Sequence, residues 1–236
     1  MKILGVIPAR GGSKGVPLKN IAPLAGRTML DWTIDAAKEV DQIGLILVST
    51  DHERIASCAL SAGVGVVERP SELSGDSTPT APVIGHAWEI ACEQGFDADC
   101  VVTLQPTSPL RTGVHIREAI ELFTENPDAD SLVSIQRVPH QFNPELLMER
   151  HGVWTRQVSQ SATLRRQDKP TYWGRNGAAI YITKAINLKR FVWGGKTLAY
   201  EMDKISSLDV DNAEDLIVAE ALLSMKLKLK DNLASS

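Results

Sequence analysis

An apolar run at residues 3–7 leads directly into a glycine-rich loop at residues 8–20. The run predicts a buried parallel strand that opens the fold. A glycine-rich loop at the carboxyl end of a first strand is where open α/β sheets bind nucleotides. Arg10, Lys14 and Lys19 lie in or beside this loop. Glycines also let backbone N–H groups approach a polyphosphate closely. The pattern therefore predicts a site for three or more negative charges.

Two common phosphate-binding loops are excluded by spacing. A Walker loop ends in Gly-Lys-Ser/Thr, and residues 11–15 (Gly-Gly-Ser-Lys-Gly) have no such ending. The dinucleotide fingerprint Gly-x-Gly-x-x-Gly does not occur in the loop either. The remaining alternative is an ordinary solvated loop, which the combination of three cations and three glycines at a strand end disfavours.

Composition narrows the class of protein. Of 236 residues, 43% are hydrophobic and 23% are charged, which is typical of one large domain or a domain with a subdomain. The net charge of −4 argues against nucleic acid as a partner. Cys58, Cys92 and Cys100 have no metal-ligand spacing and indicate reduced thiols. Without a run of ~18 apolar residues or a signal peptide, we expect a cytoplasmic protein that does not contact membranes.

Strand and helix patterns alternate along the first two-thirds of the chain, which predicts a parallel sheet covered by helices. The expected strands are 3–7, 43–48, 64–67, 100–104, 131–135 and 178–182, with further extended pieces at 198–201 and 207–210. The expected helices are 28–40, 51–62, 83–94, 112–124 and 211–228. Asp51 is the expected cap of the second helix. The fold class is therefore α/β, with a Rossmann-like, mainly parallel sheet and helices on both faces.

The regular pattern breaks at residues 137–173. Prolines, scattered aromatic residues and weak periodicity there predict an excursion from the main sheet. We expect residues 1–236 to form a single domain that contains this excursion. The long polar segment 68–82 is expected to be a loop, and long ordered loops are commonly functional.

A second polar cluster follows the expected strand at 100–104. In the run 104–111 (Leu-Gln-Pro-Thr-Ser-Pro-Leu-Arg), two prolines fix the backbone and orient Gln105, Thr107 and Ser108. These side chains are expected at the same sheet edge as the glycine-rich loop. Gln105 can both donate and accept, which suits a hydroxylated or amide-bearing substrate. The alternative is a rigid turn in which Thr112 caps the next helix.

Two aspartates, Asp209 and Asp211, flank Val210 near the end of the chain. Alternation along an expected strand places both carboxylates on one face, where a cation relieves their repulsion. Mg²⁺ takes one or two carboxylates together with phosphate oxygens. The last helix is expected to be capped by Asp211 or Asn212. The alternatives to a metal site are therefore that Asp211 is this cap and that Asp209 pairs with an arginine.

Three arginines near the end of the excursion, Arg165, Arg166 and Arg175, are candidates for holding an acidic substrate. The planar guanidinium fork matches carboxylate and phosphate geometry. Asn176-Gly177 by itself is an ordinary turn signal.

Taken in order, these motifs resemble the acylneuraminate cytidylyltransferases, the CMP-sialic acid synthetases. The matching runs are residues 9–20, Ser49-Thr50-Asp51, Arg69-Pro70, residues 105–111, Asn176-Gly177, Ile180-Tyr181 and Asp209-Val210-Asp211. The resemblance covers essentially the whole chain, and it implies a fold of the nucleotidyltransferase type. It also implies that CTP and a nine-carbon α-keto acid sugar give a CMP-sugar and pyrophosphate, with Mg²⁺ as cofactor.

The resemblance implies roles for individual residues. The implied catalytic residues are Arg10, Lys14, Lys19, Asp209 and Asp211, with the two aspartates as Mg²⁺ ligands. The implied nucleotide-binding residues are Ala9, Arg10, Gly11, Gly12, Ser13, Lys14, Lys19, Asn20, Arg69 and Thr80. The implied sugar-binding residues are Gln105, Thr107, Arg165, Arg166, Arg175 and Tyr181. The family also implies a homodimer in which the excursion helps to complete the partner's sugar pocket.

Two departures from the family pattern concern the sugar. Family members that act on N-acetylneuraminate carry a lysine near the position of Asn143, and residues 138–144 contain none. The spacing between Arg175 and Asn176 is also shorter by one residue. Legionaminate or another nonulosonate is therefore an alternative substrate. A KDO cytidylyltransferase, an inactive nucleotide or sugar sensor, and a dehydrogenase are more remote alternatives.

Overall fold

A central mixed sheet organises the chain in the computed structural model, which describes residues 1–12, 16–158, 170–177 and 179–234. The strands are β1 (Ile3–Pro8), β2 (Pro23–Leu24), β3 (Arg27–Thr28), β4 (Ile43–Thr50), β5 (Gly65–Glu68), β6 (Cys100–Thr103), β7 (Ser131–Arg137), β8 (Met148–His151), β9 (Trp154–Gln157), β10 (Trp173–Arg175), β11 (Tyr181–Lys184) and β12 (Thr197–Glu201). The α-helices are α1 (Met29–Lys38), α2 (Glu53–Ser61), α3 (Thr80–Glu93), α4 (Gly113–Glu125) and α5 (Ala213–Ala234).

The order of the strands creates a switch point at β1. The main sheet runs β10-β7-β11-β6-β1-β4-β5, and β12 also pairs with β7. From β1 the chain first builds outward through β4 and β5 and then returns to β6 on the other side of β1, with all these neighbours parallel. In open α/β sheets ligands bind at the carboxyl ends of the strands at such a reversal. The loops after β1 and β6 therefore flank the expected crevice.

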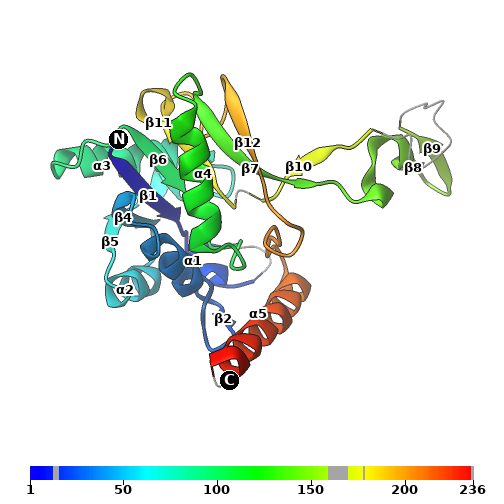
Figure 1. Cartoon of the computed structure of the whole chain (residues 1–236), viewed down its shortest axis with the longest axis horizontal. Helices are drawn as coiled ribbons and strands as arrows, with labels where there is room; N and C mark the ends of the chain where they lie inside the picture. The colour runs from blue at the N-terminus through cyan, green and yellow to red at the C-terminus, as the bar shows by residue number, and fades with distance from the viewer. Residues whose placement is uncertain (13–15, 159–169, 178, 235–236) are drawn as a thin grey trace.

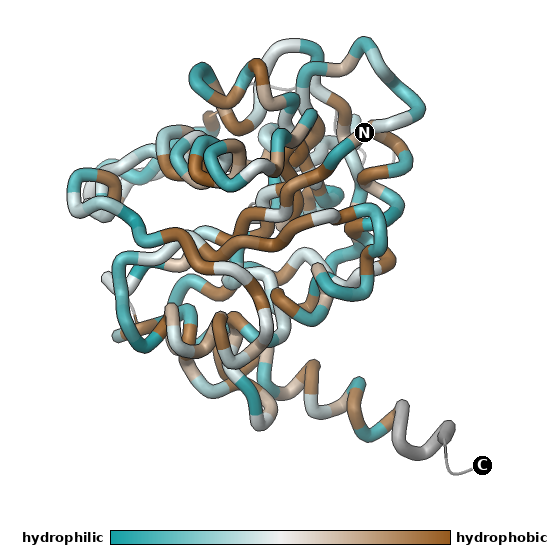
Figure 2. The backbone as a smooth tube through the Cα atoms, turned by 90° about the vertical axis from the view of Figure 1, so that its left-hand side faces the viewer, coloured by the Kyte–Doolittle hydropathy of each residue, from teal (hydrophilic) through white to brown (hydrophobic). Residues whose placement is uncertain are grey.

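Helices cover both faces of the sheet, as the sequence predicted (Figure 1). One core lies between the sheet and helices α1, α2 and α4, and a second core lies between the sheet and α3. Figure 2 shows hydrophobic residues concentrated along the central strands. The sheet is mixed because β11 runs antiparallel to both β6 and β7. The expected α/β class with a mainly parallel sheet is confirmed.

Several predicted boundaries need correction. The helix expected to begin at residue 83 begins at Thr80, and the strand expected over 178–182 is β11, which begins at Tyr181. The piece expected to be extended at 207–210 is not a strand. A turn at residues 204–207, in which the Asp203 carboxylate accepts the backbone N–H groups of Ile205 and Ser206, leads into it, and residues 208–210 are irregular.

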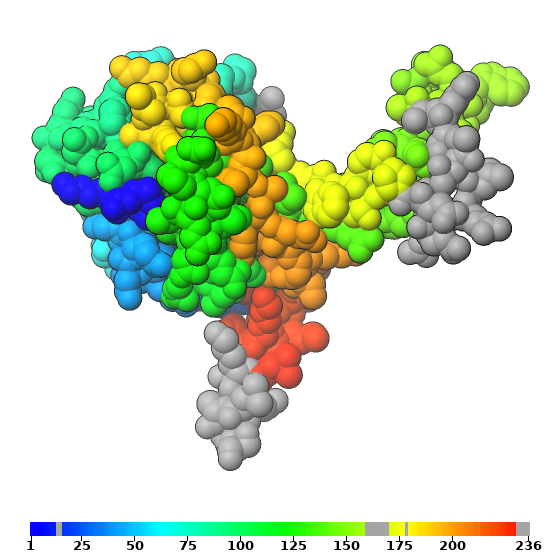
Figure 3. Space-filling view, turned by 45° about the horizontal axis from the view of Figure 1, so that its top comes forward, coloured from blue at the N-terminus to red at the C-terminus, as the bar shows by residue number. Residues whose placement is uncertain are grey.

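An arm leaves the body between β7 and β10. It contains the short 3₁₀ turns His140–Phe142 and Pro144–Leu146 and the two-stranded hairpin of β8 and β9. Figures 1 and 3 show it projecting away from the sheet. Apolar side chains on it are exposed to solvent, with Trp154 at 77% of its maximum. The described residues of this arm, 138–158 and 170–172, fall within the excursion expected at 137–173.

The last helix, α5, packs its first half against the base of the body. Ala219 and Leu223 are buried there against Leu24 and Met29. In the part of the chain that the structure describes, no helix is both long enough and apolar enough to cross a bilayer.

Substitution of Ile116 tests the packing of helix α4 against the sheet. Its side chain is fully buried on the inner face of α4, whereas Val114 on the same helix is 51% exposed. Ile116→Ala is expected to lower the free energy of unfolding by about 2–5 kcal/mol, because it leaves a cavity in a packed core. Val114→Ala is the control and should change it by less than about 0.5 kcal/mol. Equal effects of the two substitutions in urea denaturation would contradict this packing.

Candidate active site

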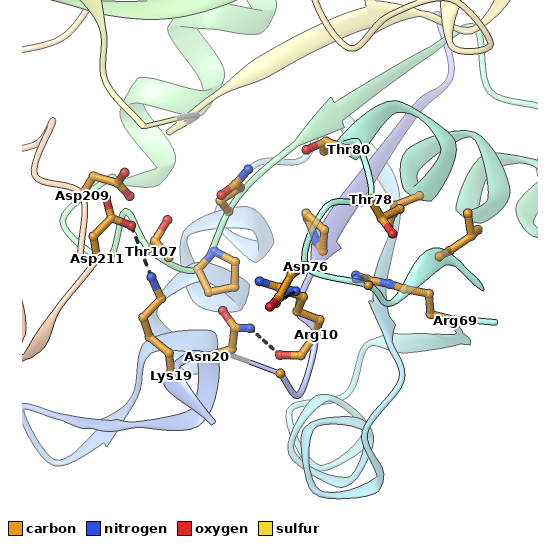
Figure 4. Close-up of a pocket in the computed structure, with 17 residues that line it drawn as sticks. Arg10, Lys19, Asn20, Arg69, Asp76, Thr78, Thr80, Thr107, Asp209 and Asp211 are labelled. Atoms are coloured by element: carbon orange, nitrogen blue, oxygen red, sulfur yellow. Dashed lines mark hydrogen bonds and ion pairs between the residues drawn. The ribbon is translucent and has the colours of Figure 1, made fainter. Parts of the chain in front are cut away.

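Four segments from distant parts of the sequence line one cavity at the switch point (Figure 4). The lining residues come from the end of β1 and the loop after it (Pro8, Arg10, Gly12, Lys19, Asn20), from the segment between β5 and α3 together with the first turn of α3 (Arg69, Leu73, Gly75, Asp76, Thr78, Thr80, Val83), from the turn after β6 (Gln105, Pro106, Thr107), and from the segment before α5 (Asp209, Asp211). Most of the nucleotide-site and metal-site residues predicted from the sequence therefore lie together. Their roles stay predictions.

The glycine-rich loop is held by a carboxylate at the end of β4. The Asp51 side chain accepts the backbone N–H of Gly11 at 2.7 Å. A Cβ at Gly11 would lie 2.6 Å from the His52 ring, so only glycine fits this close approach. The prediction that Asp51 caps the second helix is wrong. His52 caps α2 instead, by accepting the N–H of Arg54.

Within the same loop, Arg10 faces the cavity. Its guanidinium donates to the Asp76 carboxylate at 2.5 Å, and its carbonyl accepts from the Asn20 side chain at 2.9 Å. Ala9 is buried and its N–H donates to Ser49, so Ala9 belongs to the sheet rather than to the cavity wall. The sequence analysis missed Asp76, although it lies in the long loop that was expected to be functional.

Lys19 joins the loop to the late aspartates. Its Nζ donates to the carbonyl of Val210 at 2.8 Å and to Asp211 Oδ1 at 3.3 Å. Only 14% of the Lys19 side chain is exposed, while 75% of the Asp211 side chain is exposed. The cation therefore lies mostly buried beside a carboxylate that faces the open cavity.

Asp209 is the more buried of the two carboxylates. Burial raises its pKa to about 6, the Thr107 hydroxyl and Lys19 oppose this shift, and the charge of Asp211 adds to it. The Oδ1 atom is buried and has no hydrogen-bond partner among the described residues. Gly177, at φ +67°, lies so close that a Cβ there would fall 2.1 Å from Asp209 Oδ2.

Asp209 and Asp211 both lie at the cavity, but the structural feature that places them there is not the one that the sequence suggested. Strand alternation does not place them, because the segment is irregular. One backbone hydrogen bond, from the Val210 N–H to the Thr107 carbonyl at 2.7 Å, fixes it against the turn after β6. Asn212 caps α5 by accepting the N–H groups of Glu214 and Asp215, so of the two expected caps Asn212 is confirmed and Asp211 is wrong.

The donor set fits a hard divalent cation that also binds phosphate. No group of three or more His, Cys, Asp or Glu side chains gathers in the described ranges. Mg²⁺ does not require such a cage, because it commonly binds one or two carboxylates and completes its shell with waters and phosphate oxygens. The unpartnered Oδ1 of Asp209 is an oxygen of the kind that Mg²⁺ prefers.

A second cavity adjoins the first and shares Thr80 and Gln105 with it. It is otherwise lined by Ala81, Arg175, Gly177, Tyr181, Phe191, Val192 and Trp193. The Arg175 guanidinium stacks over the Trp193 ring at 4.6 Å from its centroid. It also donates to the Tyr181 hydroxyl at 3.3 Å. Trp193 and Phe191 were missed because their segment has neither periodicity nor a motif.

Other predicted residues differ in their surroundings. Arg69 is buried, its Nε and Nη2 donate to the hydroxyl and carbonyl of Ser49, and burial lowers its pKa. Ser13, Lys14, Arg165 and Arg166 lie outside the described residues.

The raised pKa of Asp209 predicts a pH-dependent effect of Asp209→Asn on stability. The folded state binds this proton more tightly than the unfolded state does, so ionisation costs stability as the pH rises from about 4 to about 6. Removing the charge is expected to raise the free energy of unfolding at pH 7 by about 1–2 kcal/mol. The gain should shrink toward pH 4. Asp211→Asn is the exposed control, and a loss of stability in Asp209→Asn at pH 7 would contradict the argument.

Comparisons with known proteins show the family of the chain. A family model described as cytidylyltransferase matches residues 4–228. The chain is 36% identical over 220 residues to N-acylneuraminate cytidylyltransferase A of Danio rerio, covering 92% of this chain and 50% of that protein. It is 35% identical over 238 residues to N-acylneuraminate cytidylyltransferase of Streptococcus agalactiae serotype III (strain NEM316), covering 98% and 56%. The chain thus spans about half the length of these curated relatives.

Solved structures share the fold. A CMP:2-keto-3-deoxy-manno-octonic acid synthetase complexed with CTP matches with a TM-score of 0.73 at 16% identity, covering 96% of this chain and 100% of that one. A 4-diphosphocytidyl-2C-methyl-D-erythritol synthase matches with a TM-score of 0.66 at 16% identity, covering 94% and 98%. The resemblance seen in the sequence motifs is confirmed by the family model: the chain belongs to the cytidylyltransferase family.

Proposed function

We propose that this chain transfers CMP from CTP to the anomeric hydroxyl of a nine-carbon acidic keto sugar and releases pyrophosphate. The observation that carries the proposal is the meeting of Lys19 with Asp209 and Asp211 at one cavity, next to a second cavity that shares Gln105. Cations and a carboxylate pair suit a metal-bound triphosphate. The relatives that match most of this chain are named N-acylneuraminate cytidylyltransferases.

The reaction is a displacement at the α-phosphorus. The anomeric oxygen of the sugar forms a bond to this phosphorus, the bond to the β-phosphate oxygen breaks, and the hydroxyl proton passes to solvent. Catalysis of this kind depends on positioning and on neutralising charge. We assign Arg10, Lys14 and Lys19 to the triphosphate, where fixed cations stabilise the leaving pyrophosphate.

The neighbouring residues of the first cavity complete the nucleotide site. Asn20 holds the Arg10 carbonyl and so fixes the loop, and Arg69 and Thr80 face the rest of the nucleotide. Gly12 and Ser13 are assigned to the nucleotide through the backbone of the loop. Ala9 and Gly11 support the loop instead, because their N–H groups donate to the Ser49 carbonyl and the Asp51 carboxylate. Gln105 lines both cavities and Thr107 lines the first, and both are assigned to the sugar.

Asp209 and Asp211 would hold Mg²⁺, with phosphate oxygens completing its shell. When bound, the ion supplies a positive charge at the phosphates and lowers the pKa of a coordinated hydroxyl. The buried position of Asp209 makes its free carboxylate unfavourable, so a cation there relieves a cost that the empty site carries.

The second cavity is the proposed sugar pocket. Of the three candidate arginines, Arg175 is the one within the residues that the structure describes. Trp193 and Tyr181 hold its guanidinium at the cavity wall, where it can bind the sugar carboxylate. Arg165 and Arg166 are the other two candidates. Asn143 does not replace the missing lysine, because it is buried and its side chain bonds the Pro170 carbonyl and the Glu145 N–H within the arm. Legionaminate therefore stays an alternative to neuraminate.

A homodimer is part of the proposal. The arm exposes several apolar side chains, namely Phe142, Leu146, Leu147, Met148, Val153, Trp154, Val158, Tyr172 and Trp173. A projecting apolar surface of this kind marks a protein interaction site. Figure 3 shows that the arm reaches well away from the body that carries the cavity.

Pyrophosphate release is the test of the proposed reaction. With CTP and Mg²⁺ present, release should require an acidic nine-carbon sugar, and the product should be the CMP-sugar. Parallel reactions with neuraminate, legionaminate and KDO rank the substrates. Tight binding of CTP and sugar without turnover would favour a sensor and contradict the proposal.

Lys19→Met is expected to lower turnover by about 10²-fold or more, because it removes a fixed cation from the triphosphate. A stability loss of about 1 kcal/mol is also expected, since the bond to the Val210 carbonyl is lost. Lys38→Met is the matched control: Lys38 also donates to a backbone carbonyl, that of Ala62, away from the cavity. Unchanged turnover in Lys19→Met would remove Lys19 from the mechanism.

A further inference from the structure

Arg111 is a buried cation that the proposed reaction does not use. It ends the turn after β6, and only 3% of the residue is exposed. Its Nη1 donates to the carbonyl of Ala179 at 2.7 Å and to the carbonyl of Gln105 at 3.2 Å. Its Nε and Nη2 have no hydrogen-bond partner in the described part of the chain. A buried arginine is normally paired, so its position calls for a reason.

The two carbonyls occupy opposite positions where two strands separate. The antiparallel ladder between β6 and β11 ends with Thr103 opposite Tyr181. Extending this register by two residues places Gln105 opposite Ala179. No backbone hydrogen bond joins those two residues, because β6 has ended and β11 has not begun. The guanidinium of Arg111 therefore bridges the two chains two positions beyond the last pair of the ladder.

Beyond Thr103 and Tyr181 the two chains diverge, and we call this opening the β6–β11 fork. Each side of the fork carries part of the candidate active site. Gln105 lines both cavities. On the other side, Gly177 lies two residues before Ala179 and packs directly against the Asp209 carboxylate. The width of the fork thus determines how far Gln105 lies from the Gly177–Asp209 contact.

We propose that Arg111 is a positioning residue that fixes the width of the β6–β11 fork and so sets Gln105 against Gly177 and Asp209. A guanidinium suits this role because one planar group donates to two carbonyls at a fixed separation. Burial lowers the pKa of Arg111 to about 9, which still leaves the group protonated at neutral pH. The inference rests on the proposed function only for its activity measurements.

Three variants separate this role from a general contribution to the core. Arg111→Met keeps the apolar stem and removes the donors, and Arg111→Lys keeps a charged donor that can reach a carbonyl. Arg117→Met is the control, because Arg117 also donates to a backbone carbonyl, that of Glu39 at 3.0 Å, away from both cavities.

Hydrogen exchange tests the fork without relying on activity. In Arg111→Met, amide exchange in the segments around Gln105 and Ala179 is expected to rise about tenfold or more, while β1 and β4 stay protected. Arg111→Lys should lie between this variant and the parent, and Arg117→Met should match the parent in these segments. Unchanged exchange at the fork, or a uniform rise over the whole chain, would overturn the proposal.

Steady-state kinetics then test the positioning role. Arg111→Met is expected to raise KM for the sugar and to lower kcat, so that kcat/KM falls by about 10²-fold. Its Kd for CTP should stay within about threefold of the parent value. Arg111→Lys should recover at least about tenfold of that loss. Equal losses in CTP affinity and in kcat/KM for the sugar, or no loss in either, would overturn the positioning role.

If the parent turns over none of the sugars, the proposed function fails, and the hydrogen-exchange measurement still tests whether Arg111 holds the fork. If Arg111→Met does not fold, hydrogen exchange and kinetics are both measured on Arg111→Lys instead.

Discussion

The contact between Lys19 and the segment at Val210 and Asp211 is the interaction on which the candidate site depends. It joins residues 191 positions apart in the sequence and brings the first loop of the chain to the last segment before α5. The loop supplies cations to the cavity, and the late segment supplies carboxylates. Together they offer both charges that a metal-bound triphosphate requires.

Charged side chains whose burial is unfavourable lie in this site and beside it. Burial disfavours the charge of the Asp209 carboxylate at the cavity, and beside the cavities Arg111 is a buried cation bonded to two carbonyls. Arg10 is paired with Asp76 at the cavity. Of these groups, Asp209 is the one whose charge costs stability until a cation balances it, which is a common property of sites that gain their balancing charge from a ligand.

The sequence predicted the parts of the structure that depend on local pattern. Buried parallel strands are continuous apolar runs, so β1 and β6 and the meeting of their following loops could be predicted. The parts that it did not predict depend on tertiary contacts. Asp51 bonds the Gly11 amide across the sheet edge instead of capping a helix, and no local signal distinguishes those two uses of an aspartate. Trp193 reaches Arg175 from an irregular segment, where periodicity gives no information.

The most direct measurement of the central claim is calorimetric titration of CTP with and without Mg²⁺. The claim is that the loop cations and the paired aspartates bind one magnesium-bound nucleotide. It predicts that Mg²⁺ strengthens CTP binding to the parent chain, and that a variant with both Asp209→Asn and Asp211→Asn loses this gain but keeps its Mg²⁺-free affinity. If the double variant gains as much CTP affinity from Mg²⁺ as the parent does, the two segments do not share a metal-bound nucleotide and the claim is contradicted.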